Sequence, residues 1–267
     1  MKRICTQNIV RSTVLVLSVV LTLSGCLQSE TVIQVRPDGS GEVVEQFAMA
    51  AGIVEMLAGF SAMGGDDQFS LYKEDELRAR ASQMGSGVRF LGVEETSSSW
   101  GEGYVARYAF SDINTLRVNQ NPSDNVPMEP DGLPGSNEEY LTFSFRRGNP
   151  STLEIHLPQP EESDSDEADE GEPSPDDLAA AMQFYEDMRV TVQVEVLGTV
   201  VATDAGHRTG NTVTIMDIDF NRILQNPELT RAILGKGAGR LADVQRLAHG
   251  VDGFAIESKE RITITFR

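Results

Sequence analysis

The stretch "TVIQVRPDGSGEVVEQF", residues 31–47, alternates apolar and polar side chains on both sides of a short polar centre. Such alternation is typical of strands with one buried face. The centre contains Pro37, Asp38 and Gly39, which together supply the dihedral angles of a tight turn. The stretch therefore predicts a β-hairpin, in which Asp38 serves the turn rather than a ligand.

Similar patterns recur along the chain. Strand-like runs occupy residues 88–96, 103–110, 140–145, 152–157 and 260–266, and the longest alternating region is 188–220. Helical spacing is found at 48–65, at 73–84, after a capping pattern at 174–177, after Pro227, and near 240–248. The expected fold class is therefore α+β, with antiparallel sheets of hairpins and several helices packed on them.

The chain begins like an export signal. Lys2, Arg3 and Arg11 precede an uncharged apolar run at 13–23. That run is shorter than the roughly 20 residues that a bilayer-spanning helix needs. We therefore interpret residues 1–25 as a cleaved signal peptide.

The end of this signal, Leu23-Ser24-Gly25-Cys26, resembles the lipobox of bacterial lipoproteins. The resemblance implies cleavage before Cys26 and acylation of its thiol and of the new amino terminus, for example with palmitate. Cys26 is then the lipidation site, and the membrane is a partner. At the position after this cysteine, an aspartate resembles an inner-membrane retention signal. This chain has Leu27 there instead, and the absence of the aspartate favours the periplasmic side of the outer membrane in a diderm cell. The alternative is an ordinary secreted protein with a cysteine at its cleavage site.

A second resemblance involves the hairpin and the long alternating region. The patterns "VIQVRPDGSGEVVE" and "DMRVTVQVEVLGTVVATDA…GNTVTIMDIDF", together with the lipobox, resemble bacterial lipoproteins of the LppM-like group. They cover about residues 26–60 and 175–225. The shared features are strands and turns, so the resemblance implies a fold and a cellular address but no activity.

Charge and composition divide the remaining chain. Loss of Lys2, Arg3 and Arg11 with the signal takes the net charge from −19 to −22. Nucleic acid is therefore excluded as a partner. Residues 161–177 contain ten acidic and no basic residues, which predicts a disordered acidic linker or loop at 158–175 rather than a calcium site. It separates an N-terminal region, 26–157, from a C-terminal region, 176–267. The second region either forms a domain of its own or completes one domain with the first.

The apolar helix expected at 48–65 is the candidate binding element. Ile53, Val54, Met56, Leu57, Phe60 and Met63 cover more than half of its circumference. That is wider than the usual core-facing stripe. Met56, Phe60 and Met63 are the candidate ligand-binding residues, for an amphiphile or an envelope protein. Core packing is the alternative role for the same side chains.

Catalytic chemistry has little support. Asp217 and Asp219 share one side of a strand and could act as the acid and base of a glycan hydrolase. A polar outer face explains the same pair. His156, His207 and His249 lie in no hydrolase or zinc pattern, and "GKGAGR" at 235–240 matches no phosphate-binding loop. We therefore predict no catalytic residues, no metal and no cofactor.

These observations converge on a lipid-anchored envelope lipoprotein that acts as a binding or assembly module and is not an enzyme. The alternative is a glycan-directed hydrolase that uses acidic residues.

Overall fold

The computed structural model describes residues 27–64, 69–119, 140–158, 185–234, 247–248, 250–251 and 253–267, with Ala179 and Met182 as single positions. Cys26, the acidic tract and the segment 235–240 lie outside the described residues, as does most of the helix expected near 240–248. Of the described residues, 48% are in strands and 25% are helical.

The larger of two sheets has eight strands, and we call it the large sheet. Its order is β10 (Arg208–Thr209), β11 (Thr212–Asp219), β8 (Arg189–Val196), β1 (Leu27–Val35), β2 (Gly41–Ala50), β4 (Gly101–Phe110) and β3 (Arg89–Ser97), and β12 (Phe254–Ile256) pairs with β11. Every pair is antiparallel except β1 with β8, which run parallel. The central strand β1 therefore joins segments from both sides of the acidic tract.

The small sheet has five strands. Its order is β5 (Arg117–Asn119), β6 (Tyr140–Arg146), β7 (Ser151–His156), β13 (Arg261–Phe266) and β9 (Val200–Thr203). It also joins distant segments, because β13 at the end of the chain pairs with β7 and with β9.

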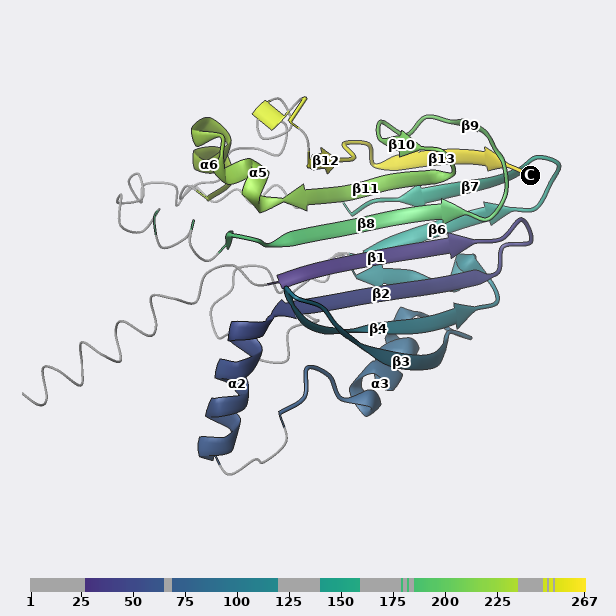
Figure 1. Ribbon diagram of the computed structural model, residues 1–267. Coiled ribbons are helices and arrows are strands. Elements are labelled where there is room, and N and C mark those ends of the chain that lie inside the picture. Colours follow the sequence, from purple (N-terminus) through teal and green to yellow (C-terminus); the bar gives the residue numbers. More distant parts are fainter. Residues whose placement is uncertain are drawn as a thin grey trace, which may run out of the picture.

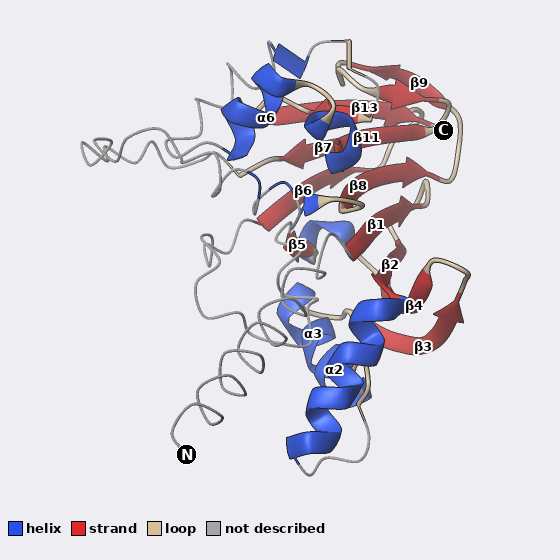
Figure 2. Cartoon of the chain, turned by 60° about the vertical axis from the view of Figure 1, so that its left-hand side comes forward, coloured by secondary structure: helices blue, strands red, loops and turns tan. Residues whose placement is uncertain are grey.

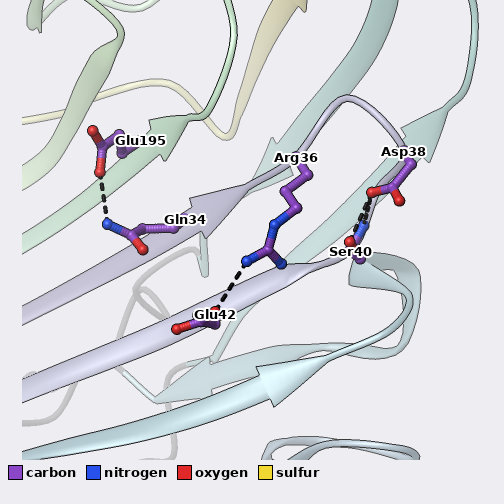
Figure 3. Close-up of polar contacts among 6 residues, drawn as sticks. All are labelled: Gln34, Arg36, Asp38, Ser40, Glu42 and Glu195. Carbon is purple, nitrogen blue, oxygen red and sulfur yellow. Dashed lines mark hydrogen bonds and ion pairs between the residues drawn. The ribbon is translucent and has the colours of Figure 1, made fainter.

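The predicted hairpin is confirmed as β1 and β2, which pair from Leu27 with Met49 to Val35 with Gly41. Its turn closes with a 2.8 Å hydrogen bond from the Arg36 N–H to the Ser40 carbonyl. The Ser40 N–H and hydroxyl donate to the Asp38 carboxylate (Figure 3), and these bonds hold the pKa of Asp38 below its ordinary value. Asp38 is thus a turn residue, as its position predicts.

The outer face of the hairpin and its neighbours is polar. Arg36 on the hairpin forms an ion pair with Glu42 at 3.0 Å, and Gln34 donates to Glu195 on β8 at 2.9 Å (Figure 3). These contacts connect side chains of neighbouring strands on the side of the sheet away from the core. The turn end of the hairpin therefore presents polar groups.

The core lies between the two sheets, which stand one behind the other in Figures 1 and 2. On the longer strands of the core, such as β1, β2 and β7, alternate side chains point inward. Val43 and Phe47 on β2 are fully buried with Leu153 and Ile264 of the small sheet. The Phe47 and Tyr104 rings stack with their centroids 5.5 Å apart. One continuous apolar cluster thus holds both sheets together.

The helices lie at the margins of this sandwich. They are α2 (Ala51–Gly64), α3 (Glu74–Met84), the single 3₁₀ turn η1 (Ile113–Thr115), α5 (Phe220–Leu224) and α6 (Pro227–Leu234). α3 buries Leu77, Ala81 and Met84 against the main cluster, whereas α5 and α6 belong to a second, smaller cluster. In Figure 1, α2, α5 and α6 all lie at the same end of the large sheet.

The predicted fold class, α+β with helices packed on sheets of antiparallel hairpins, is wrong. The inner face of the large sheet packs mainly against the small sheet, so that helices form no layer of their own. The first helix is also shorter than expected, because residues 48–50 continue β2. Short strands at 117–119 and 254–256 were not expected, and a parallel pair stands at the centre of the large sheet.

Two glycines give predictions of opposite sign. A Cβ at Gly41 would lie 1.9 Å from the Gln34 carbonyl oxygen and 2.4 Å from the Phe110 ring, whereas one at Gly59 on α2 would meet nothing within 4 Å. Gly41→Ala should lower the free energy of unfolding by about 2 kcal/mol or more. Gly59→Ala should raise it by up to about 1 kcal/mol, because alanine favours helix. Denaturant unfolding of both variants tests this, and equal effects at the two positions would contradict the assigned packing.

Candidate functional site

The candidate site lies at the end of the large sheet where β1 begins. Leu27, the residue after Cys26, pairs with Met49 near the end of β2. α2 starts two residues later, and its Ala51 N–H donates to the Trp100 carbonyl at 3.2 Å. The start of β1, the start of α2 and the turn between β3 and β4 are thereby neighbours. We call this region the β1-start end.

The apolar side chains of α2 have different surroundings along the helix. Val54 is buried in the main cluster, and Ile53 and Leu57 pack against it while partly exposed. Phe60 and Met63 lie nearer the end of the helix, with 62% and 85% of their surfaces exposed. Core packing therefore holds for Ile53, Val54 and Leu57, whereas Phe60 and Met63 are not part of the core.

Met56 lies on the stripe of Phe60 and Met63, because residues four and three apart share a side of a helix. Met56 is half-buried, whereas the other two predicted ligand-binding residues are exposed. The structure brings all three onto one stripe, as the spacing predicts. The helix carries one charged residue, Glu55, which is exposed.

The two candidate catalytic aspartates are engaged in structural contacts. Both the Nε and an Nη of Arg189 donate to Asp217 at 3.0 Å, and the Thr191 hydroxyl donates to it at 3.2 Å. The hydrogen bonds to Asp217 raise the pKa of Arg189 above its ordinary value. Asp219 caps α5 by accepting from the Asn221 N–H. The outer-face interpretation explains this pair.

The remaining sequence candidates do not gather into a site. His156 lies on β7 in the small sheet, and His207 precedes β10 in the large sheet. His249 and the segment 235–240 lie outside the described residues. Within the described part of the chain, no group of three or more His, Cys, Asp or Glu residues could hold a metal ion.

A buried ionic pair inside the sandwich was missed at the sequence level. Glu45 occupies an inward position of β2, between Val43 and Phe47, and is 7% exposed. Arg80 reaches it from α3, with the Nη1 of Arg80 3.1 Å from the Oε2 of Glu45. The pair joins α3 to the inner face of the large sheet. The signal in the sequence was the alternation of the strand, because Glu45 stands two residues from Val43 and two from Phe47 and so shares their inward side.

The surroundings of Glu45 disfavour its charge. Burial raises the pKa of Glu45, and the guanidinium of Arg80 offsets only part of this rise. Burial also raises the pKa of Tyr108 on β4, whose hydroxyl is the buried side-chain group without a hydrogen-bond partner among the described residues. The cluster stabilises the position of α3 at a cost in desolvation. Because the pair connects α3 to β2 within the core, we assign it a structural role.

Comparisons with known proteins give one neighbour. No family model matches the chain, and no curated protein matches it. Among solved structures, the chain is similar to the folded domain of LppM from Mycobacterium tuberculosis, determined by NMR, with 17% sequence identity. The match covers 72% of this chain and 81% of that chain with a TM-score of 0.26. The neighbour carries the name of the group that the sequence patterns resemble, but a score this low carries no argument about fold or function.

The raised pKa of Glu45 predicts how stability depends on pH. Its carboxyl holds a proton more tightly in the folded than in the unfolded chain. The free energy of unfolding of the parent protein, relative to Glu45→Gln, should therefore fall as the pH rises above about 4.5, the ordinary pKa. The slope can reach about 1.4 kcal/mol per pH unit. Denaturant unfolding between pH 4 and 8 measures this difference, and a rise with pH would show that the ion pair with Arg80 outweighs burial.

Proposed function

We propose that this protein is a lipid-anchored envelope lipoprotein that acts as a binding or assembly module and is not an enzyme. Acyl chains on Cys26 hold it in the membrane. In a diderm cell this is the outer membrane, with the protein on its periplasmic side. Two or more chains give stable anchoring, whereas one is marginal. After signal removal the chain has a net charge of −22, so that an anionic membrane would repel it.

The observation that carries this proposal is the position of the lipobox relative to the fold. Cys26 directly precedes Leu27, the first residue of a central strand. Cleavage before Cys26 would remove the signal and leave the described sheets whole. The anchor would then emerge at the β1-start end, next to α2.

The same end supplies the proposed binding surface. Met56, Phe60 and Met63 present an apolar stripe, of which two members are largely exposed. Exposed apolar side chains that gather on one element are typical of interaction sites. An amphiphile or an apolar surface of an envelope protein fits this stripe. Binding there would rest on apolar contact.

The hydrolase alternative is less favoured by the contacts of its two carboxylates. A nucleophile or general base must reach its substrate, and Asp217 already accepts a forked pair of bonds from Arg189. Asp219 is committed to capping α5. Activity on cell-wall fractions that disappears in Asp217→Asn, while the fold is retained, would restore this alternative.

Replacing the lipidated residue tests the anchor. Cys26→Ala should leave the protein outside the membrane fraction or as an unprocessed precursor, because it removes the thiol that receives the acyl chain. Membrane fractionation and mass spectrometry of the full chain measure both outcomes. Unchanged processing and membrane retention in the variant would contradict the proposal.

Polar substitution of the exposed stripe separates binding from core packing. The double variant Phe60→Ser and Met63→Ser should change the free energy of unfolding by no more than about 0.5 kcal/mol, because both side chains are largely exposed. It should also lose lipid or protein that co-purifies with the parent. Val54→Ser on the packed face of the same helix is the control, with an expected loss of about 2 kcal/mol or more. If the double variant loses as much stability as the control, the stripe belongs to the core.

A further inference from the structure

We propose that α2 lies along the surface of the membrane leaflet that holds the Cys26 acyl chains, with Phe60 and Met63 in contact with phospholipid. The inference rests on the proposed acylation of Cys26 and identifies the amphiphile at the stripe as the bilayer itself. The helix would be a second, non-covalent contact beside the anchor.

Placement is the first argument. Consecutive Cα atoms are about 3.8 Å apart, and paired strands lie about 4.8 Å apart. Cys26 is bonded to Leu27, and Leu27 is paired with Met49, two residues before α2 begins. An acyl chain on Cys26 would therefore leave the protein within a few residues of the first turn of α2. In Figures 1 and 2 the helix projects from this end of the sheet rather than folding back over it.

The pattern of exposure is the second argument. Among the described residues, five large apolar side chains are exposed, and two of them are Phe60 and Met63. The other three, Leu91, Leu197 and Val201, lie on or next to three different strands. The stripe on α2 thus places two exposed apolar side chains within one helical turn of each other. Ile53, Val54 and Leu57, in the first half of the helix, meanwhile pack against the body.

Length and charge decide how the helix would meet the bilayer. Its 14 residues extend about 21 Å, which is too short for a hydrocarbon core of about 30 Å. Among the described residues, no helix is both long and apolar enough to cross a membrane. With Glu55 as its one charged residue, α2 has no basic group for anionic headgroups. Its contact with lipid would accordingly be apolar and independent of anionic lipid.

The membrane is favoured over other occupants by its proximity. An anchored protein has the leaflet beside α2 at all times, so that even a weak apolar contact is populated at a high effective concentration. Trp100 lies at the same end, with its backbone bonded to the first residue of α2. It is the one tryptophan of the chain and is partly exposed. Tryptophan is enriched at membrane–water interfaces.

A depth measurement on the acylated full chain tests the inference. After signal cleavage, Cys26 is the one cysteine, so that Met63→Cys adds a single free thiol for an environment-sensitive fluorophore. The matched control is Val201→Cys, at an exposed apolar position on β9, which Figure 1 shows at the opposite end of the molecule. Both proteins are reconstituted in phosphatidylcholine vesicles with and without nitroxide-labelled lipid.

The expected result is a blue-shifted label at position 63, quenched by the nitroxide lipid roughly threefold more than the label at 201. Addition of an anionic lipid should not increase that difference. Equal quenching at both positions, with position 63 open to aqueous iodide, would overturn the inference. Shielding of position 63 from iodide without quenching by nitroxide lipid would also overturn it and would indicate a protein partner or a second copy.

Mass spectrometry of the same samples separates this inference from the proposed function. If Cys26 is acylated but position 63 is exposed to water, the proposed anchor is supported and the membrane contact of α2 is contradicted. If Cys26 carries no acyl chain, the proposed anchor fails, and the labelled chain with Cys26→Ser is added to the same vesicles. Lipid-dependent quenching at position 63 would still support the helix contact, and its absence would overturn that contact as well.

Discussion

The large sheet depends on the pairing of β1 with two very different partners. On one side β1 pairs with β2 through a five-residue turn, and on the other it runs parallel to β8, more than 150 residues away in the chain. A parallel pair needs a long crossover, and here that crossover includes α2, α3, most of the small sheet and the acidic tract. The inner side chains of β1, such as Ile33 and Val35, are fully buried between the sheets. Neither half of the chain can complete the large sheet alone.

The direction of β1 also gives the molecule two chemically different ends. At its start lie the proposed anchor and the apolar stripe of α2, whereas the turn at its end is polar and held by hydrogen bonds of Asp38 and Ser40. The net charge of the chain would repel an anionic membrane, so that the proposed attachment would have to come from apolar groups at the start of β1. A covalent anchor and an apolar helix at one end would keep the acidic remainder of the protein in water.

Local patterns predicted local structure well. The hairpin at 31–47, the strands of 188–220 and the capped helix after Asn226 follow from alternation and turn chemistry within a few residues. The stripe of Met56, Phe60 and Met63 followed from helical spacing, but its exposure did not, because spacing cannot tell which turns of an apolar helix pack against the body. Long-range pairing was invisible for a similar reason, since the β1–β8 contact joins two locally ordinary strands. Glu45 was missed because its partner, Arg80, lies on a separate helix. The fold class of sheets with helices packed on them failed because the small sheet, rather than a layer of helices, packs on the inner face of the large sheet.

Hydrogen exchange on the full chain tests the central role of β1 most directly. Amide protection is measured for residues 29–35 and 190–196 as denaturant is raised below the unfolding transition. The shared sheet predicts that both segments exchange with the same opening free energy, equal to that of global unfolding, because backbone bonds between β1 and β8 break only when the sheet opens. Exchange of 190–196 at low denaturant, while 29–35 and 41–50 stay protected, would contradict the account by showing two units that unfold separately.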